Sequence, residues 1–175
     1  GLGFPVGEID GIPGPKFADA LDGLRGRSDA AGSVDDAGPH VSPAWPDDTE
    51  EAMTAFYGPR GDHSQMGLLD LPFEMRLYQA GGQIIDQIYC HRMMHGPLRS
   101  ALEELGQFGD DYLVEHELHV TAGAFNDRRK RHGSTWSTHA WGAAIDISPN
   151  LNALGAPPRM PREVVGIFEV HGFQW

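Results

Sequence analysis

Residues 28–50 limit what this chain can fold into, because they divide it into two parts of very different size. The segment reads SDAAGSVDDAGPHVSPAWPDDTE, and it contains no Lys or Arg. Small residues, Pro and Asp dominate it without any periodic apolar pattern, which is typical of a solvated linker. A core of ordinary size can therefore form only after it. We predict a short N-terminal piece (1–27), an acidic disordered linker (28–43) and one folded domain (44–175).

The formal net charge of −12 argues against several classes of function. Nucleic acids and anionic membrane surfaces both attract basic proteins, so neither is expected as the main partner. The single cysteine, Cys90, permits no disulfide within the chain and is best explained as a small buried apolar residue. No apolar run is long enough to span a membrane. We expect a globular protein with no nucleic-acid partner and no membrane span. The sequence does not indicate its oligomeric state.

Apolar periodicity predicts the elements of the folded domain. The predicted helices are 50–57, 82–105 and 161–172, and the predicted extended or turn segments are 65–75, 113–122 and 143–148. Pro97 lies inside the longest helix and predicts a kink or break near His95 and Gly96. In the last segment, alternation would place Ala144, Asp146 and Ser148 on one face of a strand.

His139 and Asp146 lie seven positions apart with only small and apolar residues between them. Gly142 allows a sharp backbone turn that can fold His139 back towards Asp146. Ala144 would share the strand face with the aspartate and leave space for a substrate. A neutral imidazole and a carboxylate that meet at one point are the beginning of a zinc site.

The surrounding residues strengthen this interpretation by resembling a peptidase family. Ser137-x-His139-x-x-Gly142-x-Ala144-x-Asp146 fits the S-x-H-x-x-G-x-A-x-D motif of the zinc D,D-peptidases and L-alanyl-D-glutamate peptidases, peptidase family M15. The longer run WSTHAWGAAIDI looks most like the branch that includes bacteriophage endolysins and VanY-like D-alanyl-D-alanine carboxypeptidases. Three more segments, AWPDDTEEAMTAFYG, GAFNDR and IFEVHGFQW, look like parts of that branch. The similarity therefore extends over the whole predicted domain.

The resemblance implies an α+β fold of the hedgehog/D,D-peptidase kind, with a mixed, mainly antiparallel sheet, flanking helices and a shallow cleft. It implies that His139 and Asp146 are two of three protein ligands of a zinc ion (Zn2+). The fourth position of such a site holds the water that attacks an amide carbonyl. Arg128 matches the family arginine that holds a substrate carboxylate or carbonyl oxygen. Ser137 matches a hydroxyl at the cleft edge that contacts the substrate or supports a ligand.

Two parts of the family's site are absent from this sequence. The third ligand in the family is a histidine in a late motif that ends in H-F, and the general base is a carboxylate three residues before it. Because the sequence reaches Trp175 without this motif, we expect it, as printed, to bind zinc weakly and to hydrolyse nothing. His171, beside Glu169, is a less favoured substitute, because the helix dipole alone explains a histidine at a helix C-terminus.

The N-terminal piece resembles peptidoglycan-binding domain 1, whose hallmark is a G-x-IDG-I-x-GPKT run. Here the run reads GEIDGIPGPKF, with Pro13 and Phe17 as departures. The family is a small three-helix bundle, and residues 1–27 correspond to its second half only. The resemblance implies a partial helical wall-binding module. An ordinary turn and helix from another domain is the alternative.

Two pairs of histidines have simpler explanations than metal binding. His91 and His95 have the H-x-x-x-H spacing of zinc helices, but Arg92 stands where the base glutamate is expected. Two partly exposed histidines on a helix are the preferred interpretation. His116 and His119 are expected to point to opposite faces of a strand, which argues against a joint metal site.

Residues 128–132 (RRKRH) form the only dense basic run of the chain. Such a run resembles a nucleic-acid patch or a localisation signal. We prefer an arrangement in which Arg128 faces the cleft, while the rest are solvated or meet an anionic wall polymer. Trp136 and Trp141 are assigned to packing in the core or the cleft wall rather than to stacking on sugars.

These observations favour zinc-dependent hydrolysis of peptide bonds in peptidoglycan stem peptides. The enzyme would be a D-Ala-D-Ala carboxypeptidase or an L-Ala-D-Glu endopeptidase, and peptidoglycan would be its partner. The expected location is the cell wall, the periplasm or the extracellular space, or release at lysis for a phage-encoded enzyme. The alternatives are a non-catalytic wall-binding protein on a peptidase fold and a metal-dependent regulator on the same fold.

Overall fold

The computed structural model describes residues 45–131 and 133–175. The predicted wall-binding module (1–27) and linker (28–43) lie outside these ranges.

A four-stranded sheet organises the described residues, with the strand order β2-β1-β3-β4. The strands are β1 (Met66–Leu77), β2 (Gln83–His91), β3 (Val120–Gly123) and β4 (Asp146–Ile147). β1 is antiparallel to β2 and parallel to β3, and β3 is antiparallel to β4. The α+β class with a mixed, mainly antiparallel sheet is therefore confirmed.

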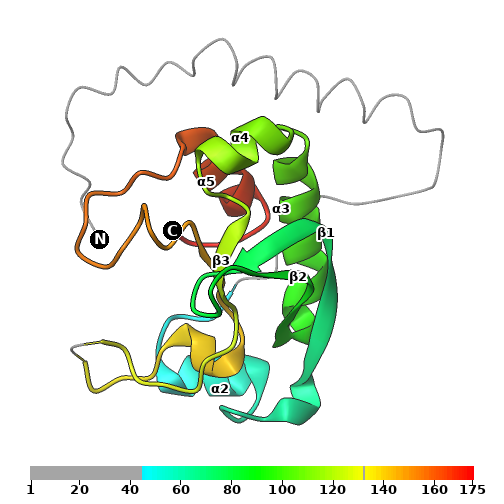
Figure 1. The fold of residues 1–175 in the computed structure, drawn as a ribbon. Coiled ribbons are helices and arrows are strands. Elements are labelled where there is room, and N and C mark those ends of the chain that lie inside the picture. The colour runs from blue at the N-terminus through cyan, green and yellow to red at the C-terminus, as the bar shows by residue number, and fades with distance from the viewer. Residues whose placement is uncertain (1–44, 132) are drawn as a thin grey trace. The chain divides into compact units, whose positions relative to one another are not determined.

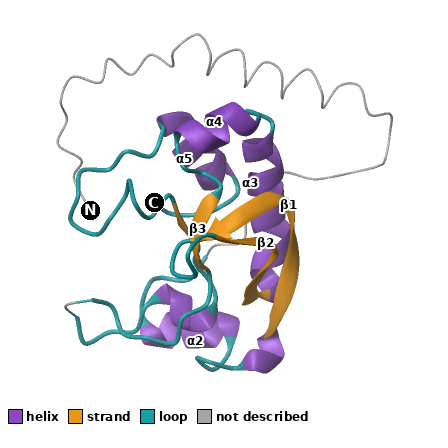
Figure 2. Cartoon of the chain, in the orientation of Figure 1, coloured by secondary structure: helices purple, strands orange, loops and turns teal. Residues whose placement is uncertain are grey.

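Four α-helices flank this sheet within the described residues. They are α2 (Glu50–Tyr57), α3 (His95–Gly106), α4 (Asp110–Glu115) and α5 (Arg162–Val170). Figure 1 shows α3 running beside β1 and β2, with α4 and α5 towards one end of the domain and α2 towards the other. Loops make up most of the chain between β3 and α5, as Figure 2 shows. None of the helices in the described ranges combines the length and apolar character that a membrane crossing requires.

Two apolar clusters hold the domain together. In the larger one, Leu98, Leu102 and Leu105 of α3 are fully buried and pack in one cluster with Leu69 and Ile88 of the first two strands. The smaller one joins α2 to the 3-10 helix η3 (Thr138–Trp141), and consists of Met53, Tyr57, Ala140 and Trp141. This second cluster matters for the site, because η3 carries His139.

The predicted helix 50–57 is confirmed as α2, and its ends have clear causes. The Thr49 hydroxyl accepts a hydrogen bond from the Ala52 N–H at 3.2 Å, which satisfies one of the free donors of the first turn. Gly58, with φ of 85°, ends the helix. The predicted helix 161–172 is likewise confirmed as α5.

The first half of the predicted helix 82–105 is wrong, because this half forms strand β2. Ile84, Ile85 and Ile88 match helical spacing, but they pair with β1 in an antiparallel hairpin. Branched side chains fit the pleated surface of a sheet well. The two glycines before β2 have positive φ and close the hairpin. The periodicity therefore fitted both kinds of element, and the turn decided between them.

The break predicted near His95 and Gly96 and the extended segment predicted around Pro72 are both present. Helix α3 begins at His95, so Pro97 lies in its first turn, where a missing N–H needs no partner, and does not kink a longer helix. Of the predicted extended segment 65–75, residues 66–75 lie in β1, and an irregularity in pairing between Asp70 and Met75 accommodates Pro72.

The two remaining extended predictions are correct only in part. Within 113–122, the first residues finish α4, Glu117 has a positive φ, and only the end belongs to β3. Within 143–148, only residues 146 and 147 form a strand. The chain turns at Ser148 (φ 50°), which is buried whereas Asp146 is exposed, so these two residues do not share a face. Alternation over so few residues does not separate a strand from a turn.

Candidate metal centre

A short hairpin returns the chain from Arg128 to the histidine of the motif. An antiparallel bridge joins its two arms. At its base, Ser137 donates its N–H to the Arg128 carbonyl at 3.1 Å, and Asn126 donates its N–H to the His139 carbonyl at 3.0 Å. These backbone bonds place η3, and with it His139, against the segment that follows β3.

Gly142 reverses the chain three residues after His139. Its φ of 65° is in the left-handed region, which glycine adopts without steric cost. Its N–H donates to the His139 carbonyl at 3.0 Å, and its own carbonyl accepts from the His91 N–H at 3.1 Å. The turn that was expected from the glycine is present, and it is docked onto the end of β2.

The turn brings the imidazole of His139 to the carboxylate of Asp146. The Nε2 atom of His139 lies 3.3 Å from Oδ1 of Asp146. The other ring nitrogen, Nδ1, lies 3.0 Å from the Ala124 carbonyl oxygen and can only donate to it. In the neutral ring this fixes the proton on Nδ1 and leaves the Nε2 lone pair directed at Asp146. The His139 side chain is 10% exposed and that of Asp146 is 49% exposed, so the pair lies at the surface with one open side.

Positive charge surrounds the Asp146 carboxylate. Burial raises its pKa, but the hydrogen bond and charge that His139 supplies when its ring is protonated, together with the charges of Arg128 and Arg131, hold the pKa below the usual value for aspartate. The carboxylate is therefore ionised at neutral pH, as a metal ligand must be.

The other two predicted site residues lie on the hairpin. Ser137 is buried, and its carbonyl accepts the Ala140 N–H at 2.9 Å, so it fixes the start of η3. Arg128 is partly buried, donates from Nη1 to the Arg129 carbonyl at 3.2 Å, and acts on Asp146 through its charge. The structure thus brings His139 and Asp146 into contact and the charge of Arg128 close to them.

No third ligand joins the pair in the part of the chain that the structure describes, where no group of three His, Cys, Asp or Glu side chains could hold a metal. His171 follows α5, and its Nε2 lies 2.9 Å from Oε1 of Glu104 on α3. This contact links the end of α5 to α3, and it agrees with the expectation that His171 is not the favoured metal ligand.

His91 and His95 do not form a metal site. His91 ends β2 and is only 4% exposed, so the prediction of two partly exposed histidines on one helix is wrong for it. Its Nε2 lies 3.0 Å from the Tyr57 carbonyl, and its Nδ1 accepts the Met93 N–H at 3.2 Å. Both ring nitrogens are therefore engaged, and the ring is held neutral between the Tyr57 carbonyl and the Met93 N–H.

The buried ring of His91 predicts a loss of stability in mild acid. Burial is the largest of the effects that lower its pKa below 6.5, and protonation would also turn the Nδ1 acceptor into a donor facing the Met93 N–H. Because the unfolded chain binds this proton more readily, the contribution is complete above about pH 6.5 and is lost as the pH falls, by at most about 1.4 kcal/mol per pH unit.

Urea unfolding at neutral and mildly acidic pH checks this expectation. The pH dependence of the free energy of unfolding should be smaller in His91→Gln than in the unchanged chain, because glutamine keeps a donor for the Tyr57 carbonyl and has no group that titrates in this range. Equal pH dependence in the two proteins would contradict the assignment.

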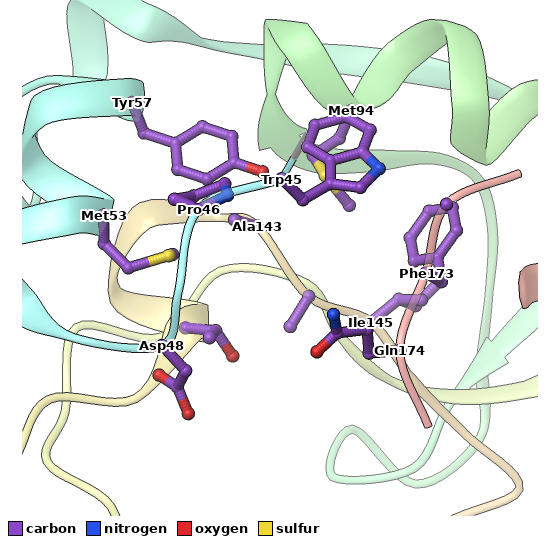
Figure 3. Close-up of a pocket in the computed structure, with 13 residues that line it drawn as sticks. Trp45, Pro46, Asp48, Met53, Tyr57, Met94, Ala143, Ile145, Phe173 and Gln174 are labelled. Atoms are coloured by element: carbon purple, nitrogen blue, oxygen red, sulfur yellow. The ribbon is translucent and has the colours of Figure 1, made fainter. Parts of the chain in front are cut away.

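A cavity of about 180 Å³ lies beside the chain between the two members of the pair. Figure 3 shows its walls, which include Trp45, Met53, Tyr57, Met94, Phe173 and Gln174. Ala143, Ala144 and Ile145 also line it, whereas His139 and Asp146 do not. Burial raises the pKa of Tyr57 to about 12, so its hydroxyl stays protonated at neutral pH. The cavity therefore adjoins the chain that links His139 to Asp146, but neither of these two residues lines it.

One contributor to the site has no signal in the sequence. The Ala124 carbonyl sets the tautomer of His139, but a backbone acceptor leaves no mark on residue type. Only the GAFNDR resemblance points to this segment, and it does so without naming the carbonyl.

A comparison with known proteins supports the resemblance of the motif to M15 peptidases. Residues 131–175, about a quarter of the chain, match the M15 family model described as D-alanyl-D-alanine carboxypeptidase. The matched segment contains Ser137, His139 and Asp146, and it confirms the resemblance to M15 peptidases there. No curated protein and no solved structure shows significant similarity to the chain.

Proposed function

We propose that the chain carries part of a zinc peptidase site that hydrolyses peptide bonds in peptidoglycan stem peptides, on the premise of its match to M15 peptidases. The observation that carries the proposal is the contact between Nε2 of His139 and Oδ1 of Asp146 at 3.3 Å. The contact has one open side, and it lies within the segment that matches a family of D-alanyl-D-alanine carboxypeptidases.

The donor set of this pair fits zinc. Imidazole nitrogen and carboxylate oxygen are common zinc ligands, at about 2.0–2.2 Å in tetrahedral sites. Two such ligands of one tetrahedral ion lie about 3.4 Å apart, which is close to the observed separation of the two atoms. The bond from Nδ1 to the Ala124 carbonyl is the kind of outer contact that orients metal-binding histidines. The fit covers two ligands, and the third has to come from a residue other than those that the structure describes.

The residues around the pair have separate roles in this proposal. His139 and Asp146 would hold the ion, which when bound supplies a water of lowered pKa and polarises the amide carbonyl. Arg128 would bind a carboxylate or carbonyl oxygen of the peptide and stabilise negative charge that develops there. Ser137 would hold the start of η3 in place, and the small side chain of Ala144 would leave room for the substrate.

Stem peptides are the proposed substrate because the matched family is described by its action on D-alanyl-D-alanine. It follows that peptidoglycan is the proposed partner, and that the protein acts in the cell wall, the periplasm or the extracellular space, or on release at lysis. Both cleavage after L-alanine and release of D-alanine are compatible with this site.

The reaction is tested with the protein expressed from its whole reading frame and loaded with zinc. A stem pentapeptide that ends in D-Ala-D-Ala is the substrate, and mass spectrometry detects free D-alanine or a product cut after L-alanine. We expect one of these products and its loss in His139→Ala. Binding of the peptide without any cleavage would favour the non-catalytic wall-binding alternative, and an absence of both would reject the proposal.

A further inference from the structure

Basic residues are concentrated on the hairpin next to the candidate metal centre. The chain has 13 Lys and Arg residues against 25 Asp and Glu residues, so it is acidic as a whole. Five of the basic residues lie on the hairpin and on the turn after α2, and we call them the basic rim: Arg60, Arg128, Arg129, Lys130 and Arg131. A local excess of positive charge on an acidic protein requires an explanation beyond solubility.

Two arginines of the basic rim stack on the ring of Trp136. The guanidinium carbon of Arg60 lies 3.5 Å from the centre of the Trp136 ring, and that of Arg129 lies 4.4 Å from it. Arg60 also pairs with Asp127, and Arg129 donates to the Ser134 carbonyl. Cations that are stacked on an aromatic ring lose little further freedom when an anion binds.

The rim has more positive than negative charge. Arg60 pairs with Asp127, and Lys130 pairs with Asp48 at 2.5 Å. Arg128, Arg129 and Arg131 have no carboxylate within ion-pair distance among the described residues. Arg129 and Arg131 are also exposed, so their charge is available to a partner in solution.

The hairpin that carries most of the basic rim continues directly into η3, which carries His139. The base of the hairpin is closed by the bond from the Ser137 N–H to the Arg128 carbonyl, two residues before His139. An anion held by the hairpin residues of the rim would therefore lie on the segment that leads into η3 and His139.

We propose that the basic rim is a recognition surface for acidic peptides, which makes the protein selective for stem peptides with free carboxylates over their amidated forms. The inference rests on the proposed function for the identity of the peptide and on the rim's charge for the selectivity. Arg129 and Arg131 are specificity-determining residues in this proposal, and Trp136 positions Arg129. Attraction between the arginines and the peptide carboxylates lets the protein discriminate between the acid and amide forms, and it speeds the association of the acid form.

The test measures binding of two peptides to the present chain in EDTA, so that neither zinc nor hydrolysis contributes. The first is L-Ala-γ-D-Glu-L-Lys-D-Ala-D-Ala with the lysine acetylated and both carboxylates free, and the second has both carboxylates amidated. We expect the acid to bind more tightly, and added salt to reduce the difference. Arg131→Gln and Arg129→Gln should each weaken binding of the acid by about two- to fivefold and leave the amide unchanged.

The matched control is Arg162→Gln, an exposed arginine at the start of α5. It should bind both peptides like the unchanged chain. Arg131→Gln provides the cleaner comparison, because Arg129 stacks on Trp136 and its loss also affects packing.

Equal affinity for the acid and the amide, or a preference that survives both substitutions, overturns the inference. It is also overturned if the arginines govern binding of polyphosphate or duplex DNA and not of the peptide. Zinc binding and peptide cleavage do not depend on this selectivity, so these results leave the proposed function standing.

Discussion

The His139→Ala variant is expected to bind zinc at least about tenfold more weakly than the unchanged chain, because even the loss of an outer contact that orients a ligand costs about ten- to a hundredfold in affinity. The imidazole supplies a lone pair on Nε2 that is already oriented by the bond from Nδ1 to the Ala124 carbonyl. Alanine removes both the ligand and the contact with Asp146 at 3.3 Å. Calorimetric titration of the chain with zinc at neutral pH, where the carboxylate is ionised, measures the change.

Other carboxylates and histidines can bind zinc weakly, so the control variants decide the interpretation. Asp146→Asn should reduce the affinity in the same direction, because it replaces the charged ligand by a neutral amide of similar shape. His171→Ala should leave it unchanged, because that ring is engaged with Glu104. If His139→Ala and His171→Ala weaken binding equally, or if neither does, the pair is not the zinc site.

The approach of His139 to Asp146 could be predicted because the turn that produces it is local. The two residues are separated by a single tight turn, and the glycine that permits the turn is visible in the sequence. Local patterns also gave α2 and α5, whose ends carry ordinary helix signals.

Features that depend on distant parts of the chain could not be predicted in this way. The isoleucines of β2 match a helical stripe, and pairing with β1 decides their structure. His91 has the spacing of a zinc helix, and its role follows from the carbonyl of Tyr57, which is 34 positions away. Arg60 reaches Trp136 from the turn after α2, so the basic rim could be predicted only as a run of charges.

The largest expected effect on stability comes from replacing Gly142, the glycine of the motif. In Gly142→Ala the added Cβ would lie 2.8 Å from the backbone nitrogen of His91 and 2.4 Å from the terminal methyl group of Met66. The methyl group can move, but the nitrogen belongs to the end of β2 and donates to the Gly142 carbonyl at 3.1 Å. We expect a loss of about 2–5 kcal/mol in the free energy of unfolding, from the left-handed backbone and from overpacking together.

Gly155→Ala is the matched control, because Gly155 also has a positive φ (83°) but no atom lies within 4 Å of an added Cβ. It should cost only the backbone term, about 1–2 kcal/mol. Urea unfolding of both variants gives the difference, which isolates the contact with β2. A similar loss in both would mean that Gly142 is needed for its backbone angles alone. A larger loss at Gly142 would show that the close approach of the turn to the end of β2 also requires glycine at this position.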